Sequence, residues 1–358
     1  MKKTLLIFVI LTMLFIPENI FAQSGESVYD NFLENSHSYN NYGIDFSKGN
    51  INFEEIFSKF INTAIKEFLG SFKGIYKTFC VILAVVFISS FAECLITSEN
   101  IDEIIRFSCC IFCSLLIGGI FNDISQPGIK SIHNIREYMN IAFPGYITLL
   151  AGSGYFSSAT TFKGIFIIIS NLMAVLIDNI IIPALYIATI LGISSGVSKS
   201  KEINKFSKLI IKTIKYLIGI ILTVFSSVIT FAGFASSVTD GLAIKTAKYA
   251  VTNFVPIVGN CLSDTLNSLI NTTVLLKNTA GYIGIFIIMF IVLSPIVKFL
   301  VASTIFKVLS LAASLLSDEG MSDILETSGN VLTTFGSMLI FLSAIYILIF
   351  GVVASLGV

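Results

Sequence analysis

Long uninterrupted apolar stretches constrain this 358-residue sequence more than any other feature. About 20 consecutive apolar residues span the hydrocarbon layer of a bilayer as one helix. The stretches that approach this length are 79–96, 107–121, 142–162, 164–195, 216–235, 282–302 and 331–354. We therefore predict an all-α, polytopic membrane protein with about six to eight transmembrane spans and additional amphipathic helices at the interfaces.

The composition excludes other classes of protein. With 55% hydrophobic and 12% charged residues, the chain does not resemble a soluble enzyme. Its 22 basic and 22 acidic residues cancel, so no basic surface suggests nucleic acid as a partner.

The N-terminus has the three-part pattern of a secretory signal peptide. Lys2 and Lys3 precede an apolar run from Leu5 to Ile16, and a short stretch ends at Ala22. We predict a signal peptide over 1–22 with cleavage near Ala22, with an uncleaved anchor as the alternative. In both cases the following chain starts outside the cytoplasm.

An extracytoplasmic segment over 23–77 is expected to precede the membrane domain, 78–358. Its first part is polar and rich in Asn and Ser, but from Phe53 apolar residues recur every three or four positions. This pattern predicts an amphipathic helix that lies along the outer leaflet or packs on a neighbouring protein domain.

The number of crossings follows from the basic stretch 199–215, which carries six Lys and one Glu and is expected to stay in the cytoplasm. An odd number of crossings must then precede Lys199. We favour five, with 142–162 crossing and 164–195 folding as a hairpin, which gives eight spans and an extracytoplasmic C-terminus. The alternative is six spans.

The same basic stretch has one cationic face. Lys201, Lys205, Lys208, Lys212 and Lys215 are spaced four, three, four and three residues apart, with apolar residues opposite. This pattern predicts a basic amphipathic helix at the cytoplasmic leaflet, where each Lys gains about 1 kcal/mol from anionic lipid. An acidic cytoplasmic partner is the alternative ligand.

A second polar face lies in 236–281, a region too polar for a clear span and too apolar for a soluble loop. Asn260, Asp264, Asn267 and Asn271 repeat at intervals of four, three and four residues. Polar groups at membrane depth need partners, so this face is predicted to contact other helices or to line a pore.

Asp178 is the clearest acid inside an apolar stretch, which makes it a candidate functional residue. A hairpin turn at Asp178 and Asn179 would instead place it at the interface, and no second ionisable group lies nearby in sequence. Gly192 and Gly196, four residues apart, would permit a close helix crossing.

Catalytic, metal-binding and cofactor-binding residues are not predicted. Cys109, Cys110 and Cys113 lie in an apolar span without His and are interpreted as packing residues. His37 and His133 are the only histidines, and no nucleotide-binding glycine loop is present. We therefore expect no cofactor and no enzymatic activity.

One region resembles a known family. The segments VTDGLAIKTAKYA at 238–250 and NFVPIVG at 253–259, with Ser263-Asp264, 275–278 and Gly281 after them, are similar to a signature stretch of the stage III sporulation protein AE family. The signal peptide, polar N-terminal segment and later spans also follow that family's order. The signature marks identity, and the resemblance implies no catalytic residue.

The resemblance implies a function in an endospore-forming bacterium. Members are multi-pass proteins of the mother-cell membrane that surrounds the forespore. They belong to a trans-envelope channel or secretion-like complex with stage III sporulation proteins AA to AH and stage II sporulation protein Q, which supports late forespore development. A self-contained channel or secondary transporter for small solutes is the alternative function.

Overall fold

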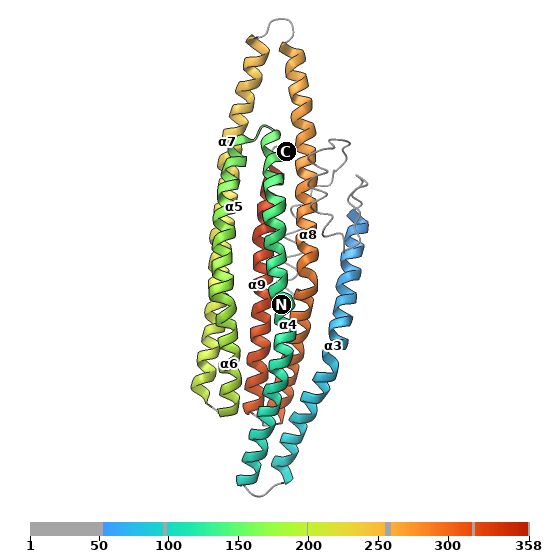
Figure 1. Ribbon diagram of the computed structural model, residues 1–358, viewed down its shortest axis with the longest axis vertical. Helices are drawn as coiled ribbons and strands as arrows, with labels where there is room; N and C mark the ends of the chain where they lie inside the picture. Colours follow the sequence, from blue (N-terminus) through green and yellow to red (C-terminus); the bar gives the residue numbers. More distant parts are fainter. Residues whose placement is uncertain (1–52, 96–98, 199, 255–258, 317–318, 357–358) are drawn as a thin grey trace.

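The computed structural model is an elongated bundle of long helices (Figure 1). It describes residues 53–95, 99–198, 200–254, 259–316 and 319–356, and none of these forms a strand. The elements are α3 (Phe53–Leu95), α4 (Glu99–Gly152), α5 (Phe156–Leu176), η3 (Ile177–Ile181), α6 (Ile182–Ser198), α7 (Lys201–Phe254), α8 (Gly259–Leu315) and α9 (Glu319–Ser355). The prediction of an all-α chain is confirmed.

Six helical stretches of the described residues are long and apolar enough to cross a membrane. They lie within the predicted range of six to eight, but the two extra crossings that we favoured are wrong. The segment 142–162 does not form one span, because α4 ends at Gly152 and α5 begins at Phe156. Gly154 lies between them at φ +86°, a conformation that glycine adopts without strain.

The expected hairpin at 164–195 is a continuous rod built from α5, η3 and α6. Pro183 has no N–H and its ring would clash with the carbonyl four residues earlier in a regular helix. The π-helical turn η3 absorbs this defect, and Ile182 N–H donates to Ile177 O, five residues before it. Asp178 therefore lies in the middle of a span, so the hairpin turn that would have placed it at the interface is not formed.

The core is the antiparallel pair α8 and α9. The most apolar stretch of each is 72% buried, compared with 17–28% for the other four spans. Aromatic rings fill the space between this pair and α4 and α5. Phe121 of α4 meets Phe335 of α9 with ring centroids 5.8 Å apart, and Phe166 of α5 meets Tyr346 of α9 at 6.4 Å.

Small residues bring α6 against α9, as the spacing of Gly192 and Gly196 predicts. A Cβ atom at Gly192 would overlap the Thr327 side chain. At Gly196 it would overlap Ile324 and lie 2.5 Å from the Gly320 carbonyl oxygen. The two glycines therefore set the distance between the axes of α6 and α9.

Two helical hairpins extend beyond the rest of the bundle at opposite ends (Figure 1). At one end α3 and α4 project past α6, α7 and α9, and at the other end α7 and α8 project past the start of α5. Both expose large apolar side chains, including Phe91, Ile104 and Phe107 on the first hairpin and Leu242 and Tyr249 on the second.

Candidate functional site

An ion pair joins Asp178 of η3 to Arg136 of α4. Arg136 Nη1 donates to Asp178 Oδ2 at 2.8 Å and Nη2 donates to Oδ1 at 2.7 Å. This bidentate geometry fixes the orientation of both side chains as well as the distance between them. The pair links α4 to the π-helical turn, an element that often marks functional sites in membrane and soluble helices.

The pair is only partly dehydrated, with side-chain exposures of 13% for Arg136 and 33% for Asp178. Arg136 Nε is buried and has no hydrogen-bond partner among the described residues. The sequence marked Asp178 but missed Arg136, because 42 residues and a turn separate the two. Arg136 belongs to a polar part of α4, and the sequence does not show that this part lies beside the span that contains Asp178.

A second polar contact fastens the start of α5 to α7. The Asp240 carboxylate accepts hydrogen bonds from Ser157 N–H and Ser158 N–H, each at 2.8 Å. Ser158 Oγ also donates to Ser236 Oγ at 3.0 Å. Asp240 thus supplies, from another helix, the acceptor that the first turn of α5 lacks, because Tyr155 gives no side-chain cap.

A third contact fastens the end of α9 to α8. The buried Lys277 Nζ donates to Leu356 O, and the Asn278 amide, oriented to satisfy its hydrogen bonds, donates to Ala354 O at 2.7 Å. The Lys277 Nζ also lies 5.6 Å from the Tyr155 ring centroid. These donors satisfy carbonyl groups at the helix end, where a positive charge is favourable.

These contacts give the signature stretch a structural role. Asp240 holds the positive end of α5 and Lys277 the negative end of α9, while the Tyr155 ring, in the turn between α4 and α5, lies under the Lys277 Nζ. Burial and the Asp240 charge raise the pKa of the Tyr155 phenol, so it stays neutral beside these charges. We call Tyr155, Asp240, Lys277 and Asn278 the end clamp.

The predicted polar face after Pro256 begins α8. Asn271 is exposed there, in the hairpin that projects beyond the bundle. The side chains of Asn260, Asp264 and Asn267 lie outside the described residues. Their role as a helix-contact or pore face stays a prediction.

The predicted basic face forms the first turns of α7, which continues unbroken into the span that follows. Lys208 Nζ is bound to Glu326 of α9 at 2.7 Å and lies 3.8 Å from Asp323. Lys212 lies over the Tyr216 ring at 5.7 Å from its centroid. Lys201, Lys205, Lys212 and Lys215 are exposed, so a lipid or partner contact on this face stays a prediction for these four residues.

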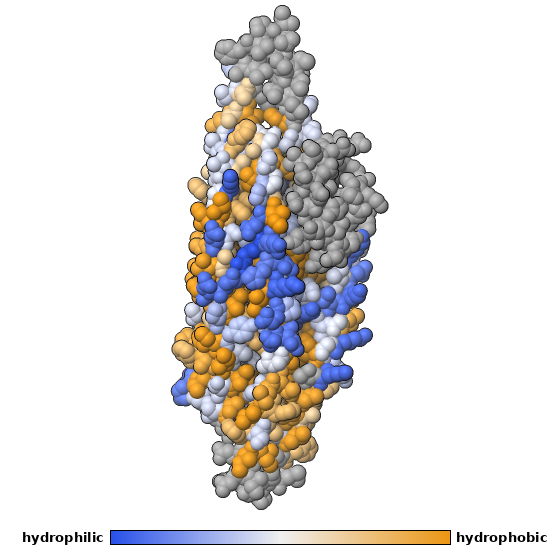
Figure 2. Space-filling view, in the orientation of Figure 1, coloured by the Kyte–Doolittle hydropathy of each residue, from blue (hydrophilic) through white to orange (hydrophobic). Residues whose placement is uncertain are grey.

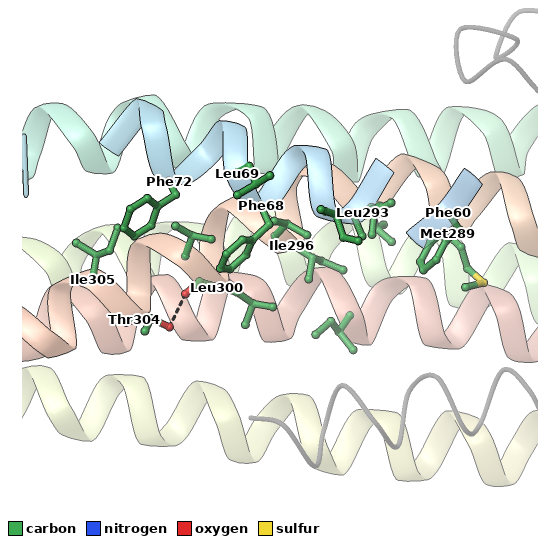
Figure 3. Close-up of a pocket in the computed structure, with 16 residues that line it drawn as sticks. Phe60, Phe68, Leu69, Phe72, Met289, Leu293, Ile296, Leu300, Thr304 and Ile305 are labelled. Atoms are coloured by element: carbon green, nitrogen blue, oxygen red, sulfur yellow. Dashed lines mark hydrogen bonds between the residues drawn. The ribbon is translucent and has the colours of Figure 1, made fainter. Parts of the chain in front are cut away.

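An apolar groove of about 530 Å³ runs between α3 and α8 (Figure 3). Phe60, Phe68 and Phe72 of α3 line it opposite Leu293 and Leu300 of α8, and Ile340 of α9 closes its floor. Its polar side chain, Thr304, donates to Leu300 O at 2.8 Å and is not available to orient a solute. The groove suits hydrocarbon and lacks the placed polar groups of a catalytic pocket.

The described residues bring no three His, Cys, Asp or Glu side chains together as a metal site. Cys110 and Cys113 are buried among apolar side chains, and Cys113 Sγ lies 3.7 Å from Met321 Sδ. Both are therefore packing residues of α4, as the sequence suggested.

Comparison with known proteins identifies the chain's relatives. The family model of stage III sporulation protein AE matches residues 38–357. Stage III sporulation protein AE of Bacillus subtilis (strain 168) is 31% identical over 191 residues, which are 53% of this chain and 47% of that relative. The aligned part thus spans about half the length of the curated relative. No solved structure matches the chain. The match over nearly all of the sequence places this chain in the stage III sporulation protein AE family.

Proposed function

We propose that this chain is a membrane subunit of a channel or secretion-like complex that crosses the envelope between mother cell and forespore. Its partners would be stage III sporulation proteins AA to AH and stage II sporulation protein Q, and the complex would be needed for late forespore development. Family membership supports a sporulation role. The observation that carries membership of a complex is the pair of projecting hairpins.

Both hairpins present apolar side chains that their own bundle does not cover. Phe107 is 50% exposed and Leu242 is 64% exposed, and each lies among other exposed large apolar residues. Contiguous exposed apolar surfaces mark protein or membrane contacts. Because the hairpins lie at opposite ends, one subunit would meet partners on both sides of the mother-cell membrane. The N-terminus of the mature chain would be extracytoplasmic, and the turn before Lys201 cytoplasmic.

Co-purification of the full-length tagged chain from sporulating cells tests this proposal. Phe107→Asp and Leu242→Asp are expected to lose the partner proteins, while the neighbouring controls Ser108→Asp and Thr246→Asp retain them. All four variants should accumulate to equal levels. A chain that purifies alone from sporulating cells and transports solute alone in vesicles would overturn the proposal.

A self-contained channel or transporter for small solutes is the second candidate. The ion pair of Arg136 and Asp178 within a span is the observation that favours it, since ionisable groups at such depth often mark ion or solute paths. Flux through vesicles that contain this chain alone is then expected to be lost in Asp178→Asn and Asp264→Asn. Unchanged flux in both variants would remove this candidate.

A further inference from the structure

One face of α4 is hydrophilic over a length that matches a bilayer. Its exposed residues Asn122, Gln126, Lys130, His133, Glu137 and Asn140 recur every three or four positions. Pro144 and Thr148 continue the same face. At 1.5 Å per residue, the stripe from Asn122 to Thr148 is about 39 Å long. We call this face the α4 polar stripe.

The ion pair fixes the depth of this stripe in the bundle. Because Arg136 bonds directly to Asp178, these two residues of α4 and η3 lie at the same height. The outer face of the rod formed by α5, η3 and α6 is mainly apolar on both sides of Asp178. Its exposed side chains include the amides Asn171 and Asn179 among the more numerous apolar residues Ile167, Ile168, Leu172, Val175, Ile180, Ile187 and Ile190. This apolar band is about 35 Å long and has Asp178 near its middle, so it fits the ~30 Å hydrocarbon layer.

The α4 polar stripe therefore crosses the same depth as the apolar band. It extends about 21 Å below Arg136 and about 18 Å above it along the helix axis. A bundle placed wholly in water would leave the apolar band unexplained, and one surrounded wholly by lipid would leave the stripe unexplained. The two surfaces fit together only if different faces of the bundle meet different surroundings.

Helix α3 extends the hydrophilic face. Glu67 Oε2 accepts a hydrogen bond from Ser294 Oγ of α8 at 3.0 Å, and Gly128 of α4 lies against Phe299, five residues further along α8. Glu67 of α3 and Gly128 of α4 therefore lie at heights that differ by no more than about 8 Å along the bundle. On α3, exposed Asn62, Lys66, Lys73 and Lys77 share one side, and Figure 2 shows hydrophilic surface at mid-height over α4 and α3.

The apolar first part of α4, in the hairpin of α3 and α4, lies at a different height from the apolar band of α5 and α6. Exposed Ile104, Phe107 and Leu115 precede the stripe along α4, toward the turn that joins α3 to α4. Most of the segment of α4 that sequence alone marks as a span, 107–121, therefore lies below the apolar band of α5 and α6, and only its end reaches the band, where Phe121 contacts Tyr186. The polar part of α4 occupies that level instead.

We propose that the α4 polar stripe faces water at bilayer depth and forms this chain's share of the wall of an aqueous passage. Polar groups at membrane depth are stable where they line a water-filled cavity. The stripe carries both signs of charge together with amides, which suits hydrophilic solutes. The inference rests on the proposed function, because other subunits of the complex must complete the wall.

Single cysteines in a full-length chain without its native cysteines test the proposal in membranes from sporulating cells. Gln126→Cys, His133→Cys and Glu137→Cys sample the stripe, and Val175→Cys, Ile180→Cys and Ile187→Cys sample the apolar band at matching heights. The probe is a membrane-impermeant maleimide, which reacts with the thiolate and therefore needs water at the site. Thr160→Cys, exposed at the start of α5, gives the rate for an accessible residue.

Stripe cysteines are expected to react within roughly tenfold of the Thr160→Cys rate, and band cysteines at least about 100-fold more slowly. Stripe cysteines that react only after detergent is added would show that lipid or protein covers the stripe, which overturns the inference. Band cysteines that react as fast as the stripe would instead remove the membrane placement on which the proposed function depends. Equal melting temperatures of the variants confirm that each is folded.

Discussion

Several ionisable residues of this family member look isolated in the sequence but have partners in the structure. Asp178, Asp240 and Lys277 each lie in a mainly apolar stretch, and each has a partner on a different helix. A charge in a poorly hydrated site is costly unless it is paired, so these contacts determine how the helices fit together. The loss of one partner should cost more than the loss of both.

Arg136→Gln is expected to destabilise the protein by about 1–3 kcal/mol, because it leaves the Asp178 carboxylate without its counterion. This range is below that of a fully buried pair because Asp178 is 33% exposed. The double variant Arg136→Gln/Asp178→Asn should recover at least half of the loss. Thermal unfolding in detergent measures both. Additive losses in the double variant would show that the two side chains are not coupled.

Asp240→Ala is expected to cost about 1–2 kcal/mol, since two N–H groups of the first turn of α5 lose their acceptor. Hydrogen exchange at Ser157 and Ser158 should accelerate in this variant, whereas Asp240→Asn, which keeps an acceptor oxygen, should show a smaller change. Asp123→Ala replaces an exposed acid on α4 and serves as the control. Unchanged exchange at α5 in Asp240→Ala would contradict the capping role.

At the scale of elements, the bundle depends on close approaches between helices as much as on apolar area. The contact of α6 with α9 needs glycine at two positions, and the rod of α5, η3 and α6 needs a π-helical turn to pass Pro183. Regular helices of the same hydropathy would cross the membrane but would not pack in this arrangement.

Two glycine substitutions should therefore act in opposite directions. Gly196→Ala is expected to cost about 1–3 kcal/mol, because the new methyl group overlaps Ile324 and the Gly320 carbonyl. Gly164→Ala, at a helical position with nothing within 4 Å, should be neutral or stabilise by up to about 1 kcal/mol. Melting temperatures of the two variants provide the comparison. A neutral Gly196→Ala would mean that α6 and α9 are further apart than the structure shows.

For the whole molecule, the number of membrane crossings determines on which side of the membrane each turn lies. With six spans and an extracytoplasmic start, Lys163 lies near the outer end of α5, whereas eight spans would place it in the cytoplasm. A single cysteine at Lys163, which is exposed, should then react with an impermeant reagent added outside and be protected from the inside. Labelling from the cytoplasmic side alone would restore the arrangement with eight spans.

The sequence predicted the parts of this molecule that depend on local pattern. Apolar length predicted the helices, the spacing of Gly192 and Gly196 predicted a close crossing, and the signature stretch predicted the family. It did not predict Arg136 as the partner of Asp178, or the end clamp, because these contacts join residues 42 to 83 positions apart. The sequence also did not predict that the polar part of α4 lies level with the apolar band of α5 and α6. Hydropathy gives the length of an apolar stretch, but not its position along the bundle relative to neighbouring helices.

The central position of α8 and α9 has a consequence for synthesis. The chain is made from its N-terminus, so α3 to α7 leave the ribosome before the two helices that supply most of their packing surface. Until then, Gly192 and Gly196 of α6 lack the α9 residues against which they pack, whereas the contacts of Asp178 with α4 and of Asp240 with α5 need neither α8 nor α9. Assembly of the bundle is thus expected to wait for the last two helices, and a chain stalled after α7 would be a substrate for membrane quality control.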